Sequence, residues 1–319
     1  MARDRRRPRS GGDGASSRGS SRPVAAEQQV PSGGRFSDRM RAESPYPPLR
    51  TTFGHALRAL GASPAILLLP LLFVGALWLG LVACGLEVFP RTLVEAVALP
   101  PVSSFYTDWI IPASIAGQSL GALAIIVVIT LVRSLVWSLL VGMLLEALEY
   151  GTVTRVGVLQ GLQAFRTILA VMLASLFAIL ASIVLLPAIL GSIGLLVFTF
   201  VLAGGIYLLP FAPAAAVRGN LPPMEAFRRS TRAARLPGPR HMVLAVLYFF
   251  VVLLLVAFVP GGSIITANPP LSEWAWDLGG TVVQVLFLAA FCERWLAVED
   301  IVPTGPAPRR QPRTPPRRR

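Results

Sequence analysis

The sequence predicts an all-α integral membrane protein with about six transmembrane helices in three hairpins, each preceded by a short amphipathic helix in the membrane interface. Hydrophobic residues make up 54% of the chain and charged residues only 14%, against about 25% charged residues in an ordinary soluble domain. Between Arg166 and Arg218, 51 residues pass without an Asp, Glu, Lys, Arg or His. Such a run fits two helices of about 20 residues, the length that crosses a hydrocarbon core about 30 Å thick.

Uninterrupted apolar runs mark the six predicted spans. In chain order they cover residues 64–86, 116–145, 168–186, 193–217, 241–259 and 278–298. The third and fourth spans are expected to form a hairpin that turns within 187–194, because a proline and two glycines interrupt the apolar pattern there. The spans together predict one membrane domain, residues 51–300, between two polar tails, residues 1–50 and 301–319.

Arginine is distributed unequally between the two sides of these spans. All 29 basic residues are Arg; 12 precede the first span, six lie within 218–240 and seven lie from Arg294 onward, whereas the opposite loops carry only Arg91. Basic residues near the ends of spans are retained in the cytoplasm. We therefore expect a multi-pass protein of a bacterial cytoplasmic (inner) membrane, with both termini in the cytoplasm.

The two tails are rich in Arg, Pro, Gly and Ser. They lack the apolar residues that would offset the entropy of ordering, so we expect both to be disordered. A basic segment beside a membrane gains about 1 kcal/mol per charge from anionic lipid. Anionic lipids are therefore the expected partners of the tails, together with other membrane proteins. Nucleic acid is not an expected partner, because no aromatic residues alternate with the arginines.

A stripe of polar and small residues runs along one face of the second span. Its members recur every four residues and two charged residues lie beside it: Ser134, Ser138, Gly142 and Glu146, with Arg133 and Glu149. Residues at this spacing share one helix face, which should contact other helices and not lipid. This favours a continuous second span over the alternative, in which the span ends at Arg133 and residues 134–149 lie in the interface.

Arg133 is the central residue of a candidate polar site within the membrane, together with Ser134, Ser138, Glu146 and Glu149. A charge near the bilayer centre costs about 2.5–3.5 kcal/mol on insertion scales and is tolerated when it is paired or faces a wet cavity. Arg133 would then bind an anion or gate a path. The alternatives are a structural ion pair with Glu146, Glu149 or Glu293, or a side chain that snorkels to the interface.

The fourth span contains residues that interrupt helices: Gly204, Gly205, Pro210 and Pro213. An interrupted helix can expose backbone groups that bind substrate in a transporter. The same residues can also simply kink a helix, since proline and glycine are common in membrane spans. The sequence leaves both readings open.

An internal repeat precedes the hairpins. Six residues recur in the same spacing, and a looser third copy precedes the first span: Gly157, Leu159, Leu162, Ala164, Phe165 and Arg166; Gly219, Leu221, Met224, Ala226, Phe227 and Arg228; Ala56, Leu57 and Arg58. In each copy an apolar side chain can dip below the headgroups while the Arg reaches phosphate. We expect interfacial elbows with Arg58, Phe165, Arg166, Phe227 and Arg228 at the membrane surface.

The copy before the fifth span also carries a family resemblance. Its residues are Pro223, Met224, Glu225, Ala226, Phe227, Arg228, Arg229 and Ser230, and Glu149, Tyr150 and Gly151 end the second span in a similar layout. This pattern resembles bacterial polytopic proteins of the YciC-like type and the membrane domain attached to some glycerophosphoryl diester phosphodiesterases. The resemblance spans about residues 51–298. It implies a six-helix membrane domain and no catalytic residues.

The sequence predicts no catalytic, cofactor-binding or metal-binding residues. His55 and His241 are the only histidines, the two cysteines do not form a metal-binding pattern, and no nucleophile or phosphate-loop motif occurs. The expected function is a non-catalytic membrane scaffold or accessory component that acts on lipids or partner proteins. The alternatives are a transporter with a cavity near Arg133 and the broken fourth span, and a membrane enzyme acting on lipid.

Overall fold

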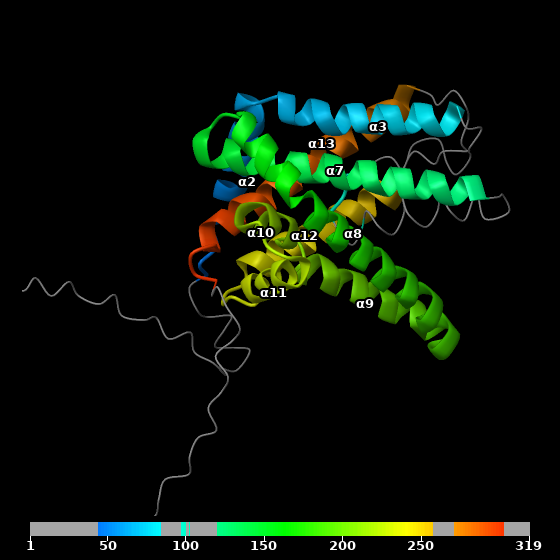
Figure 1. Ribbon diagram of the computed structural model, residues 1–319. Coiled ribbons are helices and arrows are strands. Elements are labelled where there is room, and N and C mark those ends of the chain that lie inside the picture. The colour runs from blue at the N-terminus through cyan, green and yellow to red at the C-terminus, as the bar shows by residue number, and fades with distance from the viewer. Residues whose placement is uncertain (1–43, 84–96, 100–101, 103–119, 258–270, 303–319) are drawn as a thin grey trace, which may run out of the picture.

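The computed structural model describes residues 44–83, 97–99, 102, 120–257 and 271–302, and every regular element in these ranges is an α-helix (Figure 1). The helices are α2 (Leu49–Ala62), α3 (Ala65–Ala83), α7 (Leu120–Tyr150), α8 (Arg155–Leu190), α9 (Ser192–Leu208), α10 (Ala212–Gly219), α11 (Pro223–Ala234), α12 (Arg240–Ala257) and α13 (Leu271–Val298). The predicted all-α class is confirmed. Both predicted tails lie outside the described residues, apart from 44–50 and 301–302.

Four stretches in the described part of the chain are long and apolar enough to cross a membrane: Val127–Tyr150, Arg155–Leu190, Ser192–Gly219 and Trp274–Val298. The pair α2 and α3, bent by 82° at residues 63–64, could form a fifth. The apolar part of α12, Arg240–Leu255, is shorter. The structure therefore indicates a multi-pass membrane protein. Each of the six predicted spans coincides with a helix or helix pair, and six crossings stay a prediction.

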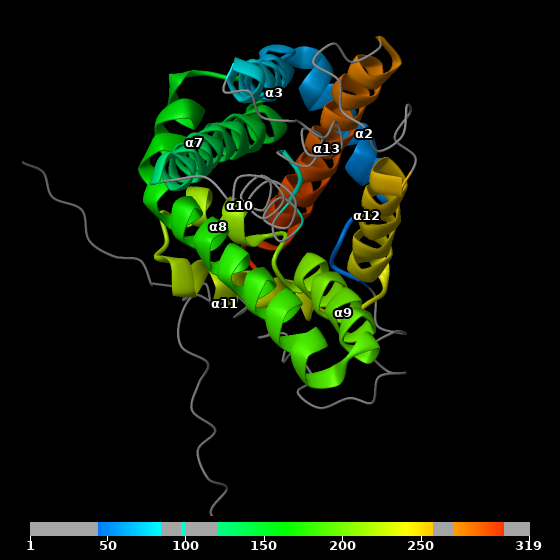
Figure 2. The ribbon, with the colours of Figure 1, turned by 90° about the vertical axis from the view of Figure 1, so that its right-hand side faces the viewer.

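The long helices run alongside one another, and the short ones gather at one end. On the left of Figure 1, α2, α10 and α11 lie beside the first turns of α8 and the last turns of α13; we call this the polar end. Figure 2, a view along the bundle, shows the long helices arranged around α10, in which residues 212–217 are all buried. Of the four candidate spans α13 is the most buried, at 67% of its apolar window, and Ser192–Gly219 the least, at 12%.

The second predicted elbow is not a separate helix. Residues 157–166 belong to α8, which runs for 36 residues, or about 54 Å, well beyond the thickness of a hydrocarbon core. The other two elbows are separate helices, α2 and α11. Ser63 and Pro64 end α2, and α11 is followed by a Pro-Gly-Pro turn in which Gly238 has φ of 96°. No such residues separate the second elbow from its span, so the helix continues.

The fourth span is broken at the second of the two predicted places and not at the first. Helix α9 is continuous through Gly204 and Gly205, and the chain turns only at 209–211 around Pro210. Pro213 lies in the first turn of α10, where its missing N–H removes no helical hydrogen bond. Since α9 has 17 residues, about 25 Å of helix separates the hairpin turn at Gly191 from the break. The break is therefore close to the polar end and not at mid-membrane depth.

Candidate functional site

The structure places the polar stripe of α7 between helices. Ser134 and Ser138 are fully buried, Glu146 is 8% exposed, and Arg133 beside them is fully buried. The Ser134 hydroxyl donates to the carbonyl of Thr130, one turn earlier, at 2.7 Å. Each of these side chains therefore lies within the protein, and the stripe faces α8.

Gly142 in this stripe lies where the backbones of α7 and α8 pack against each other. A Cβ at Gly142 would collide with the carbonyl oxygen of Gly157 and lie 2.9 Å from the backbone nitrogen of Gly161. Gly157 and Gly161 form a Gly-x-x-x-Gly pair, a spacing that lets helix backbones pack closely. This pair was missed in the sequence, although its spacing was the signal for it.

Glu146 closes the start of α8. Its carboxylate accepts hydrogen bonds from the backbone N–H of Thr154 at 2.8 Å and of Gly157 at 3.0 Å, and from the Thr154 hydroxyl. The Thr154 hydroxyl oxygen in turn accepts from the backbone N–H of Val156. A negative charge at a helix N-terminus is favourable, because the N–H groups of the first turn have no partner within the helix. Glu146 therefore joins α7 to α8.

Glu149, at the end of α7, belongs to a second charged group. The Arg218 guanidinium at the end of α10 donates to both Glu149 oxygens, at 2.6 and 2.8 Å, and its Nε donates to Glu299 at 3.3 Å. The paired bonds to Glu149 have the fork geometry that suits a carboxylate. Arg218 thus connects the end of α7, the end of α10 and the residue after α13.

The three expected acidic partners of Arg133 are all engaged elsewhere. Glu146 binds the start of α8, Glu149 binds Arg218, and Glu293 accepts from Nδ1 of His55 at 2.6 Å. Glu146 is also 13 residues further along α7, about 20 Å, which exceeds the reach of an Arg side chain. An ion pair of Arg133 with Glu146, or with Glu149 three residues further along the same helix, is therefore ruled out by distance, whereas the pair with Glu293 stays a prediction.

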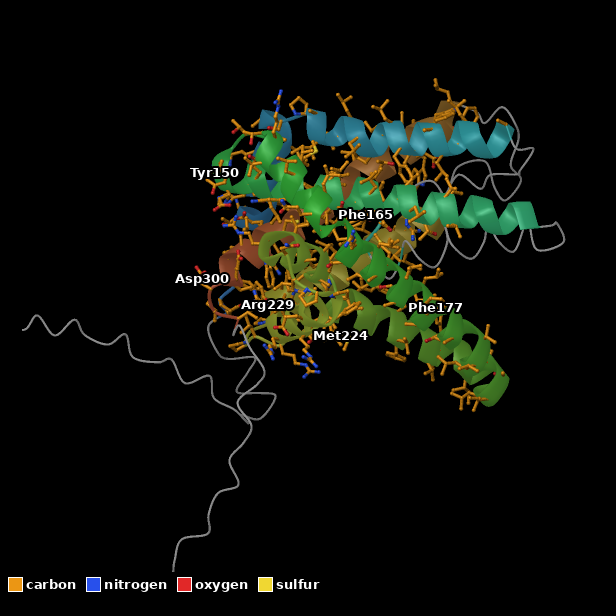
Figure 3. The ribbon with its side chains drawn as sticks, in the orientation of Figure 1. Tyr150, Phe165, Phe177, Met224, Arg229 and Asp300 are labelled. Atoms are coloured by element: carbon orange, nitrogen blue, oxygen red, sulfur yellow. The ribbon has the colours of Figure 1, made fainter. Side chains whose placement is uncertain are left out.

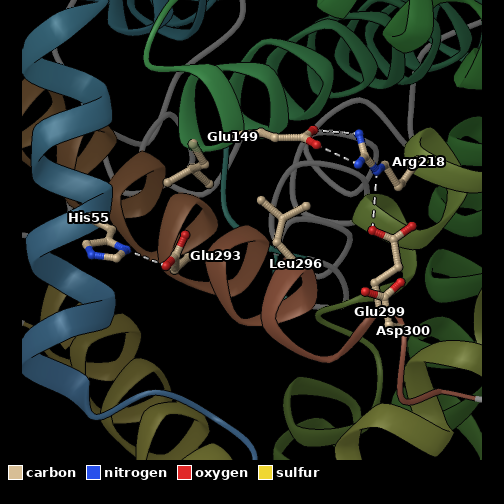
Figure 4. Close-up of a pocket in the computed structure, with 8 residues that line it drawn as sticks. His55, Glu149, Arg218, Glu293, Leu296, Glu299 and Asp300 are labelled. Atoms are coloured by element: carbon tan, nitrogen blue, oxygen red, sulfur yellow. Dashed lines mark hydrogen bonds and ion pairs between the residues drawn. The ribbon is translucent and has the colours of Figure 1, made fainter. Parts of the chain in front are cut away.

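A pocket of about 420 Å³ at the polar end brings these charged groups together (Figure 4). Its lining comes from α2, α7, α10, α13 and the residues after α13: His55, Leu148, Glu149, Arg218, Glu293, Leu296, Glu299 and Asp300. Four carboxylates therefore face one guanidinium and one imidazole. Burial raises the pKa of Glu299; Arg218 opposes this shift, whereas Asp300 and Glu149 add to it. The pocket thus carries more acidic than basic groups.

The side chains that line this pocket can form hydrogen bonds and ion pairs. Among the residues that the structure describes, no group of three or more His, Cys, Asp or Glu side chains is arranged to hold a metal ion. The lining also lacks a Ser, Thr or Cys that could act as a nucleophile. The sequence analysis did not assemble this pocket. A signal existed, because the predicted topology places the ends of the second, fourth and sixth spans on the same membrane side.

The three elbows have matching exposure. The repeated alanines, Ala56, Ala164 and Ala226, are at most 1% exposed. The arginines two positions later, Arg58, Arg166 and Arg228, are all exposed, whereas Phe165 and Phe227 are half-buried. Each elbow therefore turns its small residue toward the bundle and its Arg away from it.

A buried Arg that the sequence analysis did not single out fixes the segment before α2. Arg294 is fully buried, donates to the backbone carbonyl of Arg240, and lies 5.7 Å from the ring of Tyr46. The Tyr46 hydroxyl donates to the carbonyl of Ala233, at the end of α11, at 2.6 Å. Residues 44–48 thus form a strap across the polar end.

His241 supports the strap from within the core. Its Nε2 lies 2.8 Å from the carbonyl oxygen of Tyr207, to which it donates, and its ring packs against Tyr46 and Phe211. His241 is the first residue of the predicted fifth span, and only 1% of it is exposed. Its role is packing, since the aromatic rings around it exclude water.

Comparison of the chain with protein-family models, curated proteins and solved structures finds no match in any of the three. The resemblance to the YciC-like and phosphodiesterase membrane domains therefore stays a prediction.

Proposed function

We propose that this protein is a non-catalytic scaffold or accessory component of the cytoplasmic membrane, with the polar end and both termini in the cytoplasm. The observation that supports this best is the use made of its charged side chains at the polar end. Glu146 joins α7 to α8, Arg218 joins α7, α10 and the end of α13, and Arg294 holds the strap. Such contacts hold helices in fixed positions, as a platform for other molecules requires.

Partner proteins and lipids would meet this platform from the cytoplasmic side. The pocket offers surplus carboxylates to a basic group of a partner, and the Arg-rich tails suit anionic lipid. By resemblance, a functional comparison is with the membrane domain of YciC-like proteins. That domain would supply placement in the membrane and leave any chemistry to a partner.

The transporter alternative receives less support. A transporter of the broken-helix type exposes backbone groups near the bilayer midplane, whereas the break at 209–211 follows about 25 Å of continuous helix. Residues 212–217, directly after the break, are all buried. The position of the break therefore fits a role in packing α10 into the bundle better than a role in a substrate path.

A deletion strain tests the scaffold proposal. We expect one or more membrane proteins to lose abundance or to shift on native gels when this protein is absent, and to recover with the wild-type chain. Complementation with Arg133→Gln should restore the same proteins, because a scaffold needs the bundle and not an intramembrane charge. Unchanged partner proteins, together with a solute-uptake defect that Arg133→Gln fails to rescue, would favour the transporter. A changed lipid profile that Glu149→Gln fails to rescue would favour an enzyme.

A further inference from the structure

We propose that the three elbow arginines, Arg58, Arg166 and Arg228, bind the phosphates of anionic phospholipids in the leaflet at the polar end. They would form a set of lipid contacts on the folded domain, separate from those expected of the Arg-rich tails. The proposal rests on the membrane location and not on the scaffold role.

The first support is the shared orientation of the repeat. In each copy the alanine is buried and the Arg is exposed, although the copies lie on three different helices, α2, α8 and α11. All three helices meet at the polar end (Figure 1). A repeated residue whose exposure is the same in three packing environments is not needed for the core. What the three arginines share is that they are exposed on the outer surface of the protein.

The depth of Arg166 agrees with a headgroup position. From Arg166 to Leu190, at the hairpin turn, α8 has 24 further residues, or about 36 Å. With the usual tilt of membrane helices this spans about 28–36 Å along the membrane normal, close to one hydrocarbon thickness. Phe177, 68% exposed, lies further along α8 from the polar end (Figure 3). Arg166 therefore lies where the lipid-facing surface of α8 meets the phosphates.

The helices that carry the other two arginines have apolar side chains on their outer surface. Leu57 on α2 is 56% exposed and Met224 on α11 is 65% exposed. Met224 and Arg228 are four residues apart, so they share one face of α11. An apolar side chain beside an exposed Arg suits the boundary between acyl chains and phosphates. Water alone would not favour exposure of Leu57 and Met224.

The elbow arginines differ from the neighbouring arginines in how closely they pair with carboxylates. Arg229 and Arg232 lie 3.7 and 3.9 Å from Glu225, and their side chains are only 13% and 25% exposed. Arg228 is 60% exposed and reaches Glu225 only at 4.0 Å. Among the described residues no carboxylate pairs with Arg58 or Arg166. The elbow arginines therefore keep their charge available for an external phosphate.

The test uses the full-length protein in detergent, with phosphatidylglycerol or phosphatidylcholine added to the micelles. We expect phosphatidylglycerol to raise the melting temperature by several degrees more than phosphatidylcholine does. The triple variant Arg58→Gln, Arg166→Gln, Arg228→Gln should lose most of this difference. The charge-matched tail variant Arg309→Gln, Arg310→Gln, Arg313→Gln should keep it. Inorganic phosphate should produce no comparable rise.

Three results would overturn the proposal: an undiminished lipid effect in the elbow variant, loss of the effect in the tail variant, or an equal effect of inorganic phosphate.

If the elbow variant does not fold, spin labels test the proposal instead. They are attached at Leu57, Met224 and Phe177, one at a time, in a chain with Cys84→Ala and Cys292→Ala. Labels at residues 57 and 224 should be shielded from a water-soluble relaxation agent, and the label at 177 shielded more strongly. A label at 57 or 224 as accessible as one in the tail would contradict the proposal. A failed search for partner proteins would leave all these readouts unchanged.

Discussion

Glu146 shows how one ionised residue can be accommodated at the end of a membrane helix. Its carboxylate accepts two backbone N–H groups and one hydroxyl from the start of the next helix, so its charge is compensated without a basic partner. Arg294 uses the complementary solution, since it donates to backbone carbonyls. Glu146 satisfies N–H groups at the start of α8, which lack partners within that helix, whereas Arg294 joins carbonyl oxygens at the start of α12 and before α2.

Replacement of Glu146 should therefore destabilise the junction of α7 and α8. We expect Glu146→Ala to lower the free energy of unfolding by about 1–3 kcal/mol, because the N–H groups of Thr154 and Gly157 lose their acceptor. Thermal or denaturant unfolding in detergent measures this. Gln163→Ala, at an exposed position on the same helix as Gly157, serves as the control and should have little effect. Equal stability of the two variants would contradict the capping role.

Glu299 should give the polar end a measurable pH dependence. Its pKa is raised in the folded protein, chiefly by burial, so the folded state binds this proton more readily than the unfolded state does. The charged Glu299 therefore destabilises the fold at neutral pH. This penalty is relieved as the pH falls through the raised pKa, toward the ordinary Glu value of about 4.3.

The measurement compares wild type with Glu299→Gln across this pH range. Wild type should gain stability relative to the variant as the pH is lowered from neutral. A difference in melting temperature that stays constant, or that changes in the opposite sense, would show that Glu299 is not destabilised by burial.

At the scale of elements, the decisive contact is the crossing of α7 and α8. Gly142 meets Gly157 and Gly161 with no room for side chains, so the two backbones fix the position of both helices. The Glu146 cap lies one turn from this crossing, at the same helix pair. Close packing and the hydrogen-bonded cap therefore reinforce each other.

A pair of Gly→Ala variants tests this contact. Gly142→Ala should cost about 1–3 kcal/mol of stability, because the new methyl group would collide with the backbone of α8. Gly204→Ala, inside α9 with no heavy atom within 4 Å of the new Cβ, should be neutral or stabilise by up to about 1 kcal/mol. Unfolding in detergent measures both. A tolerated Gly142→Ala would mean that the helices cross further apart.

The sequence was informative about helices and less so about their ends and neighbours. Each of the six apolar runs coincides with a helix or a helix pair, because hydropathy depends on local composition alone. The continuity of α8 through its elbow and the position of the break at Pro210 depend on local stop signals, which were only partly recognised. The pocket of His55, Glu149, Arg218 and Glu293 joins residues up to 238 positions apart, as in the pair His55 and Glu293. No local pattern encodes that contact.

At the scale of the whole molecule, charge and burial divide the protein between two environments. The polar end gathers the charged network, the pocket and the strap, whereas α8 and α9 present large apolar side chains such as Phe177 and Phe200 along most of their length. In a membrane protein these apolar surfaces face lipid, and the charged end faces water or headgroups.

Topology reporters test the orientation of the molecule. Fusions to a cytoplasm-active reporter after residue 319, and before residue 1, should both be active, and a fusion in the turn at Gly191 should be active only with a periplasm-specific reporter. The excess of Arg on one side of the spans is the physical reason. Termini on opposite sides would show that the number of crossings is odd and would remove the proposed common side of the elbows.

The strap also has a consequence for biogenesis. Tyr46 and Pro47 emerge from the ribosome before any helix that the structure describes, yet Arg294, which contacts them, lies in the last of these helices. The polar end can therefore close only after α13 has been inserted. Until then residues 46 and 47 lack the contacts that Arg294 gives them, so the first described segment of the chain is among the last to be fixed in place.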